Sequence, residues 1–208
     1  MRVRFVTGNA SKVAETAAII RSLRASQPDA GLPAFDLVHE VMPDIPEIQD
    51  LNVEIVARHK ALAAFAAVGE PVVVEDTGLY IRAWGRLPGS FIRFFLAELG
   101  QEGILRMFQG FPDRRARAET AFAYCDAGGV VTGTGVVQGW IAETARGALG
   151  FGWDSLFIPA PGYPMDLMQA PAGLPTYAEV AESAKNAASM RRAAISHLLA
   201  QLAAPGKT

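Results

Sequence analysis

The chain has 208 residues, of which 50% are hydrophobic and 19% are charged, and its formal net charge at pH 7 is −2. This composition is typical of one folded domain with a sizeable core and excludes a disordered chain. The charge balance argues against binding to a nucleic acid polymer or to a membrane surface. A single cysteine, Cys125, excludes an internal disulfide framework. Because we find no signal peptide and no bilayer-spanning apolar run, we expect a soluble cytoplasmic protein.

The first predicted element is a strand at residues 2–6, which leads into a short polar turn. Apolar residues at helical spacing follow, so the pattern predicts strand, tight turn and helix. The free amides at a helix N-terminus attract anions, and a lysine adds a positive charge in the first turn. The turn therefore resembles a phosphate-binding loop, although an ordinary capped helix start is the alternative. Its residues are Thr7, Gly8, Asn9, Ala10, Ser11 and Lys12.

A second strand is predicted at residues 35–42, followed by an irregular segment in which two prolines flank acids that include Glu47. A helix is predicted from about residue 52 to residue 68, with Lys60 part-way along it. A lone lysine on a helix is usually solvated. The inner face of this helix is expected to consist of Ile55, Leu62 and Phe65.

Residues 71–74 are expected to form a short buried strand, because three consecutive valines pack well in a sheet that is covered on both faces. Glu75 and Asp76 follow at once, and open α/β folds place their ligands where strands end. Adjacent residues of an extended chain point to opposite faces. We therefore expect one of the two acids to face a cleft and to handle a metal or a water molecule, unless both are simply surface acids.

Residues 116–124 and 129–141 alternate in the manner of antiparallel strands. Before them, we expect one helix that includes Phe95 and Leu99 and a second, short helix at residues 102–108. The glycines between residues 133 and 139 superficially resemble a dinucleotide-binding fingerprint. Their spacing is wrong and no helix follows, so we reject that function.

The glycine-flanked turn at residues 150–157 contains Phe151 and Trp153, which are expected either to stack on a planar base or to fill the core. A long loop rich in proline, glycine and methionine follows at residues 159–175. The last predicted element is a helix at residues 183–202, on which Lys185 and Ser189 share one face. Its inward residues are expected to be Ala188, Ile195, Leu199 and Leu202.

Taken in this order, the motifs resemble the inosine triphosphate pyrophosphatase family, whose members hydrolyse non-standard purine nucleoside triphosphates. Each motif is weak alone, but their order over nearly the whole chain is specific. The resemblance implies an α/β fold with a long, mixed central sheet flanked by helices. It also implies a single domain of two lobes over residues 1–208, an active site in the cleft between the lobes, and a homodimer. The matching residues are 7–12, 46–47, 60, 75–79, 87–89, 150–154, 185–189 and 191.

The resemblance further implies Mg²⁺-dependent hydrolysis of a nucleoside triphosphate to the monophosphate and pyrophosphate. Glu47 and Asp76 would bind the metal ion, and Asp76 would also be the base that activates water. This agrees with the preference of Mg²⁺ for a few carboxylate oxygens plus substrate phosphates. The phosphate and sugar contacts would come from residues 7–12, Lys60, Thr77 and Lys185. The base pocket would consist of Phe151, Gly152, Trp153, Asp154, Ser189, Met190 and Arg191.

The chain departs from the pattern of this family at several positions. Met190 stands where histidine is usual, Arg86 replaces a usual glycine, and the loop at 159–175 is longer than usual and carries Met165 and Met168. We therefore expect the phosphate end of the site to be intact and the base end to be altered. One alternative is the same chemistry on another nucleotide. A non-catalytic nucleotide-binding protein is the other, although it would have little use for the full set of charged residues.

Overall fold

The computed structural model describes residues 1–160 and 162–204, and its strands form one mixed sheet. The strand order is β2-β1-β3-β5-β6-β7, and the short β4 pairs with β3 outside this path. β1 is parallel to β2 and β3, whereas the other pairs are antiparallel. The strands are β1 (Arg2–Val6), β2 (Asp36–Glu40), β3 (Val72–Ile81), β4 (Pro88–Gly89), β5 (Arg115–Asp126), β6 (Gly129–Ile141) and β7 (Phe157–Pro159).

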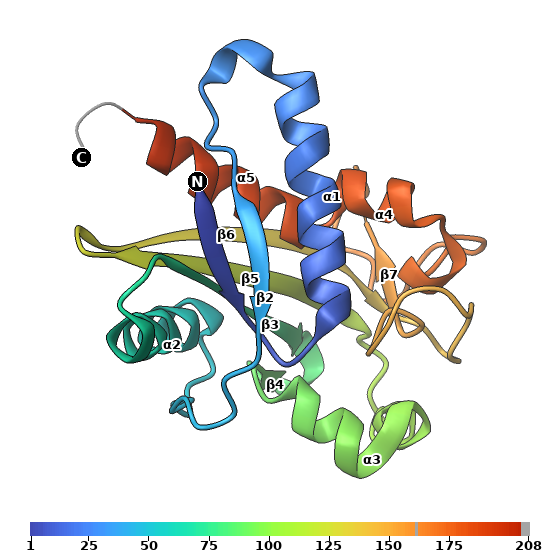
Figure 1. Ribbon diagram of the computed structural model, residues 1–208. Coiled ribbons are helices and arrows are strands. Elements are labelled where there is room, and N and C mark those ends of the chain that lie inside the picture. The colour runs from blue at the N-terminus through green and yellow to red at the C-terminus, as the bar shows by residue number, and fades with distance from the viewer. Residues whose placement is uncertain (161, 205–208) are drawn as a thin grey trace.

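Helices flank this sheet, and Figure 1 shows α1 and α5 on one side of it, α2 on the other, and α3 next to β4. The predicted mixed α/β fold is therefore confirmed. That residues 1–208 form a single unit of two lobes stays a prediction, since 161 and 205–208 lie outside the described residues. The helices are α1 (Ala10–Ser26), α2 (Val53–Val68), α3 (Ile92–Arg106), α4 (Glu182–Ala188) and α5 (Met190–Ala203), with 3₁₀ turns η1 (Pro28–Ala30), η2 (Arg82–Trp84) and η3 (Tyr177–Glu179).

The core consists of separate clusters of buried side chains. One cluster joins α1 and α5 to the sheet through residues such as Phe5 and Phe122, and a second joins α2 to the opposite face through Val72 and Val74. A third lies around Phe157, near α3 and the second half of β3. Because burying a large apolar side chain contributes about 1.5–3 kcal/mol, these clusters hold the helices against the sheet. Among the described residues, none of the helices has the length and apolar character that crossing a bilayer requires.

The central strand β3 is longer than predicted, and its two acids do not mark its end. Glu75 pairs with Phe122 and Asp76 with Ala121, and pairing continues to Ile81. The antiparallel partner β5 supplies ladder hydrogen bonds well beyond the carboxylates, so the partner and not the local sequence decides where β3 ends. The carboxylates therefore lie in the middle of a rigid strand.

The bounds of α2 agree with the prediction, and of its predicted inner residues Phe65 packs against the core, whereas the other two do not. Asn52 caps its start by accepting a hydrogen bond from the Glu54 amide, and Gly69 ends it with a φ of 69°. Ile55 and Leu62, however, are 40% and 42% exposed. Small side chains let the helix lie close to the sheet, and larger ones on the flanks reach solvent. The buried face is Val53, Val56, Ala57, Ala61 and Ala64.

The predicted C-terminal helix is two helices, because Ser189 is extended with a ψ of 156°. Its hydroxyl accepts a hydrogen bond from the Arg192 amide and so caps α5. Lys185 and Ser189 therefore do not share a helix face, and Ala188 is exposed. The prediction that Ile195 and Leu199 point inward is confirmed, since both are fully buried.

Two further features of the sequence gain a structural explanation. The two helices expected around residues 92–108 join into α3 across a kink at Gly100, whose φ is 63°. A Cβ at Gly135 would lie 2.2 Å from the Met190 carbonyl oxygen, and one at Gly133 would lie 2.4 Å from the Leu198 amide nitrogen. The glycines that superficially resemble a nucleotide fingerprint thus allow α5 to lie directly against β6.

Candidate active site

A cavity of about 430 Å³ brings most of the predicted site residues together. Its wall draws on the β1–α1 turn, the segment before α2, the middle of β3, the first turns of α3 and the start of α5. Ala10, Ser11 and Ser189 lie outside that wall. The predicted residues within it are Thr7, Gly8, Asn9, Lys12, Glu47, Lys60, Asp76, Thr77, Phe151, Gly152, Trp153, Asp154, Lys185, Met190 and Arg191.

The β1–α1 turn is built as the sequence predicts. Asn9 is the N-cap of α1, and its Oδ1 accepts a hydrogen bond from the Ser11 amide at 3.0 Å. The Asn9 amide donates to Thr7 Oγ1 at 3.2 Å. These contacts fix the turn so that the side chain of Lys12 points from the first turn of α1 to Glu75, with Nζ 3.1 Å from Oε1.

Asp76 is the carboxylate with the least support from its surroundings. Its Oδ2 is buried and has no hydrogen-bond partner among the described residues. Burial raises the pKa of Asp76 to about 7, since the positive charges of Lys12 and Lys60 are opposed by the carboxylates of Glu47 and Glu75. A buried carboxylate without a hydrogen-bond partner is strongly stabilised when it binds a cation or a proton. It is therefore the natural acceptor of both in this cavity.

Glu47 lies at the same end of the cavity in an ion-pair cluster. Its Oε1 is 3.0 Å from Lys60 Nζ and its Oε2 is 3.3 Å from Arg93 Nη2. Burial acts to raise the pKa of Glu47, but the charge and hydrogen bond of Lys60 hold it below its usual value. Glu47 thus stays ionised. Sequence reasoning missed Arg93, which is an exposed residue of α3 and belongs to no recognisable pattern.

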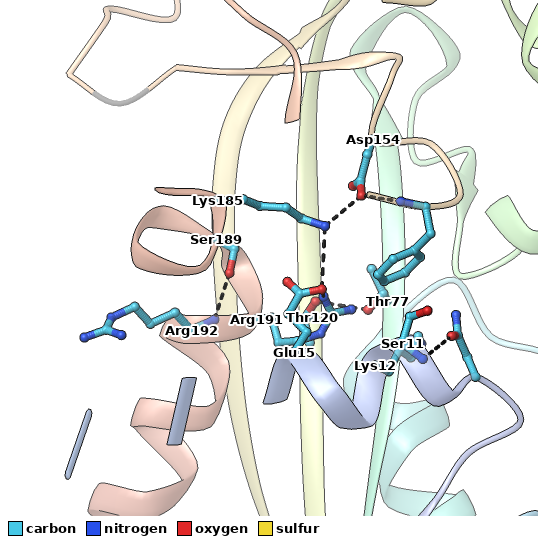
Figure 2. A network of polar contacts seen from close by, with 12 residues as sticks. Ser11, Lys12, Glu15, Thr77, Thr120, Asp154, Lys185, Ser189, Arg191 and Arg192 are labelled. Carbon is cyan, nitrogen blue, oxygen red and sulfur yellow. Dashed lines mark hydrogen bonds and ion pairs between the residues drawn. The ribbon is translucent and has the colours of Figure 1, made fainter. Parts of the chain in front are cut away.

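The far wall is a buried network of balanced charges, and Figure 2 shows the part of it that contains Glu15, Asp154 and Lys185. Arg191 binds Glu75 through Nε–Oε2 and Nη2–Oε1 contacts of 2.7 and 2.9 Å, and its Nη1 lies 2.8 Å from Glu15. Lys185 Nζ lies 2.7 Å from Asp154 Oδ2 and 3.6 Å from Glu15 Oε2. Three cations, Lys12 included, therefore balance three carboxylates, as buried charges require.

Two acids of this network have roles that the sequence reasoning did not assign. Burial acts to raise the pKa of Glu75, but the charges of Arg191 and Lys12 hold it well below its usual range. Glu75 is therefore an ionised anchor, and it also accepts a hydrogen bond from Thr77 Oγ1 at 2.7 Å. Glu15 follows Lys12 by three residues on α1 and so lies on the same side of that helix. This spacing is the one signal that pointed to it.

The two aromatic residues of the 150–157 turn have different surroundings. Trp153 is 7% exposed and packs edge-on against Phe157 at 5.6 Å, so its ring belongs mainly to the core. Phe151 is half-buried, and the cations of Lys185 and Arg191 lie 4.7 and 5.6 Å from the centre of its ring. Of the two, Phe151 offers the ring that a planar ligand can approach.

The expectation that the long loop at 159–175 shapes the base end of the site is wrong. None of the described residues of this loop lies in the cavity wall. Instead, the Leu167 carbonyl accepts a hydrogen bond from Trp140, and the Met168 carbonyl accepts one from the Arg114 amide. The loop is held against the ends of β5 and β6, whereas the first turns of α3 contribute to the cavity wall.

Comparison with known proteins agrees with this architecture. The model of the Ham1 family matches residues 3–201. Inosine triphosphate pyrophosphatase 2 of Trypanosoma cruzi is 38% identical over 195 residues, which cover 93% of this chain and 88% of that protein. The dITP/XTP pyrophosphatase of Pyrobaculum aerophilum is 37% identical over 202 residues, which cover 97% and 96%. The Ham1 protein of Staphylococcus aureus, a solved structure, shares the fold with a TM-score of 0.71 at 24% identity over 97% of this chain and 98% of its own. With such identity over nearly its whole length, this chain belongs to the Ham1 family.

Proposed function

We propose that this protein is a Mg²⁺-dependent pyrophosphatase that hydrolyses nucleoside triphosphates to the monophosphate and pyrophosphate, with a preference for the deaminated purine nucleotides ITP, dITP and XTP. The observation that carries the proposal is Asp76, a buried carboxyl group without a hydrogen-bond partner among the described residues, in a cavity that also contains Lys12, Lys60 and Lys185. The relatives described above are named for this reaction on these substrates.

The residues present fit a magnesium ion. Among the described residues, no group of three or more His, Cys, Asp or Glu side chains is arranged to hold a metal by itself. Mg²⁺, however, is commonly held by one or two carboxylates together with substrate phosphates and water. Asp76 and Glu47 would supply those carboxylates, and the unpartnered Asp76 Oδ2 agrees with such a role. When bound, the ion would neutralise phosphate charge.

The chain's own residues would carry out the remaining steps. A nucleoside triphosphate brings about four negative charges, which repel an attacking water until cations offset them. Lys12 and Lys60 would bind the phosphates, which would draw Lys60 away from Glu47. Asp76 would orient the attacking water and accept its proton on its carboxylate. Catalysis in such a site consists mostly of positioning and electrostatic stabilisation.

The proposal includes a homodimer in the cytoplasm. A sedimentation measurement on the full chain tests the first part, and fractionation of the source cells tests the second.

The experiment that tests the reaction is pyrophosphate release from a panel of nucleoside triphosphates in the presence of Mg²⁺. We expect release from ITP and XTP to exceed release from ATP and GTP. Release of inorganic phosphate instead of pyrophosphate would overturn the proposed bond cleavage. Binding of the panel without any release would favour a nucleotide-binding protein that does not catalyse.

Replacing Lys12 or Lys60 with Met is expected to weaken triphosphate binding and to make the remaining binding less sensitive to salt. The monophosphate, which carries less charge, should be affected less. Titration calorimetry of both ligands at two salt concentrations measures the effect. Arg58→Met, which changes an exposed residue of the same helix as Lys60, is the matched control. Equal losses for the two ligands would assign a structural role to these lysines.

A second candidate function, the same chemistry with a different base preference, is favoured by Met190. Its side chain is 2% exposed and lies in the cavity wall, where it donates no hydrogen bond. Deaminated purines carry a carbonyl acceptor at the position where adenine carries an amino group, so a donor in the wall discriminates between them.

Met190→His is therefore expected to raise the ratio of kcat/KM for ITP over ATP. The increase should correspond to the free energy of one hydrogen bond, about 0.5–1.5 kcal/mol. Met190→Leu, which keeps the volume and adds no donor, is the control and should leave the ratio unchanged. If the parent already rejects ATP by several orders of magnitude and the His variant does not alter the ratio, Met190 does not set base preference.

A further inference from the structure

A second groove, of about 530 Å³, lies apart from the candidate active site and shares none of its described wall residues. Four of the nine described residues that line it are arginines, and we call it the arginine groove. This concentration of positive charge stands in a chain whose net charge is −2. Its arginines are Arg82, Arg86, Arg115 and Arg117.

Two walls bring these arginines together. Arg115 and Arg117 are two residues apart on β5, so their side chains leave the strand on the same face. Arg82 begins the turn η2, and Arg86 follows that turn after Gly85, whose φ of 73° reverses the chain. The register pairs Arg117 with Tyr80, the residue just before the end of β3. Antiparallel pairing thus places segments about 30 to 35 residues apart in the sequence around one groove.

The β5 wall is held in place before any ligand arrives. Arg115 donates to both oxygens of Asp113, at 2.8 and 2.7 Å, and to the Met165 carbonyl at 3.0 Å. The guanidinium of Arg117 lies 4.4 Å from the centre of the Tyr80 ring, and its buried Nε has no hydrogen-bond partner among the described residues. Fixed arginines lose less side-chain freedom when they bind, which favours recognition.

The positive charge of the groove exceeds the negative charge beside it. Asp113 contacts Arg115 and Arg82, and Glu119 lies 3.4 Å from Arg117. The hydrogen bonds that Arg115 donates to Asp113 and, to a smaller extent, the charge of the exposed Asp166 raise the pKa of Arg115. Four guanidinium groups therefore stand against three carboxylates, and no carboxylate of the described residues lies within 4.0 Å of Arg86.

We propose that the arginine groove binds a small oligophosphate, either free pyrophosphate or the phosphate tail of a nucleotide. Guanidinium groups bind phosphate oxygens in pairs of parallel hydrogen bonds, and several of them converge here on one space. The volume exceeds the need of a single phosphate and lies within the range of about 300–1,000 Å³ that holds small organic ligands. Arg86, without a nearby carboxylate, and Arg117, whose side chain is 43% exposed, would supply the new contacts.

The groove has a physical connection to the candidate active site. Arg117 packs on Tyr80, whose hydroxyl donates to the Leu51 carbonyl at 2.6 Å. Leu51 belongs to the segment that carries Glu47 and leads into α2. Two contacts therefore join the arginine groove to the segment that carries the candidate metal ligand.

Titration calorimetry with pyrophosphate in the absence of divalent cations tests the proposal. The background variant Lys12→Met/Lys60→Met weakens binding in the candidate active site, so that the arginine groove dominates the signal. Adding Arg86→Gln/Arg117→Gln is expected to weaken the remaining binding by about tenfold or more, because two charge-assisted contacts are lost. Arg21→Gln, which changes an exposed arginine of α1, is the matched control and should have no effect beyond twofold.

Three outcomes decide the proposal. A loss in the groove variant, also seen with the single exposed substitution Arg86→Gln, supports it. Adenosine diphosphate that binds much more tightly than pyrophosphate identifies a nucleotide tail as the ligand, and equal binding identifies the phosphates alone. Unchanged affinity and stoichiometry in the groove variant would overturn the proposal. If sedimentation also showed that this variant changes the dimer fraction, the arginines would serve contacts between copies of the chain instead. Since the readout is binding, this result is independent of whether the proposed hydrolysis occurs.

Discussion

Asp76→Asn is expected to lower turnover by about 10²-fold or more, which is the scale of a lost acid/base group, while the fold and most nucleotide binding remain. The amide has the shape of the carboxyl group but neither accepts a proton from water nor binds a cation strongly. Because Asp76 Oδ2 is buried without a partner among the described residues, the change removes a charge that the folded protein holds at a cost. The free energy of unfolding should therefore not fall.

Pyrophosphate release at saturating substrate measures this loss, and calorimetric unfolding measures the stability. Asp44→Asn is a suitable control, since Asp44 is an exposed acid that precedes Glu47 in the same segment and lies outside the cavity wall. Turnover within a few-fold of the parent would show that Asp76 is not the base. Loss of both turnover and stability would show that the carboxylate serves the fold.

The second large effect concerns the buried network. Arg191→Met removes the cation that faces Glu75 and Glu15, and it leaves two buried carboxylates without that compensation. Breaking a buried ion pair in this way costs about 3–5 kcal/mol. We therefore expect this variant to lose that much of its free energy of unfolding, as measured by urea denaturation.

Two further variants make the test specific. Arg192→Met changes the neighbouring residue. Among the described residues, the only hydrogen bond of its guanidinium is to Ser22 Oγ, so the free energy of unfolding should change by no more than about 0.5 kcal/mol. The double variant Glu75→Gln/Arg191→Met should lose less free energy of unfolding than the two single variants lose together. When both charges of the pair are removed, neither is left buried without its partner. Strict additivity would mean that the two side chains do not stabilise each other.

Much of the local structure follows from the sequence, because short-range chemistry decides it. Asn9 and Asn52 cap the helices that follow them, as their side chains predict. The three valines before Glu75 form a buried strand, and the order of the motifs predicted the mixed α/β fold. Most of the predicted site residues were identified through the order of these motifs, and they meet in one cavity because the fold brings their segments together.

Two of the errors come from contacts between distant segments, and the third comes from a local side-chain cap. The length of β3 depends on β5, more than 30 residues later, and the break at Ser189 depends on a capping bond that competes with helix continuation. The inner face of α2 is chosen by how closely the helix approaches the sheet, which favours alanine over larger residues. A periodic pattern of apolar residues contains no information on that distance.

The sequence by itself therefore determined which elements form, which charged residues stand in turns, and to which family the motifs point. Only the tertiary structure decided that Arg93 joins Glu47, that Glu15 and Arg191 balance each other in the core, and that the long loop lies beside the arginine groove and away from the cavity. The physical reason is that ion pairs and cavities join side chains through space. Their energies depend on burial and distance, and both are set only when the sheet has brought separate segments of the chain together.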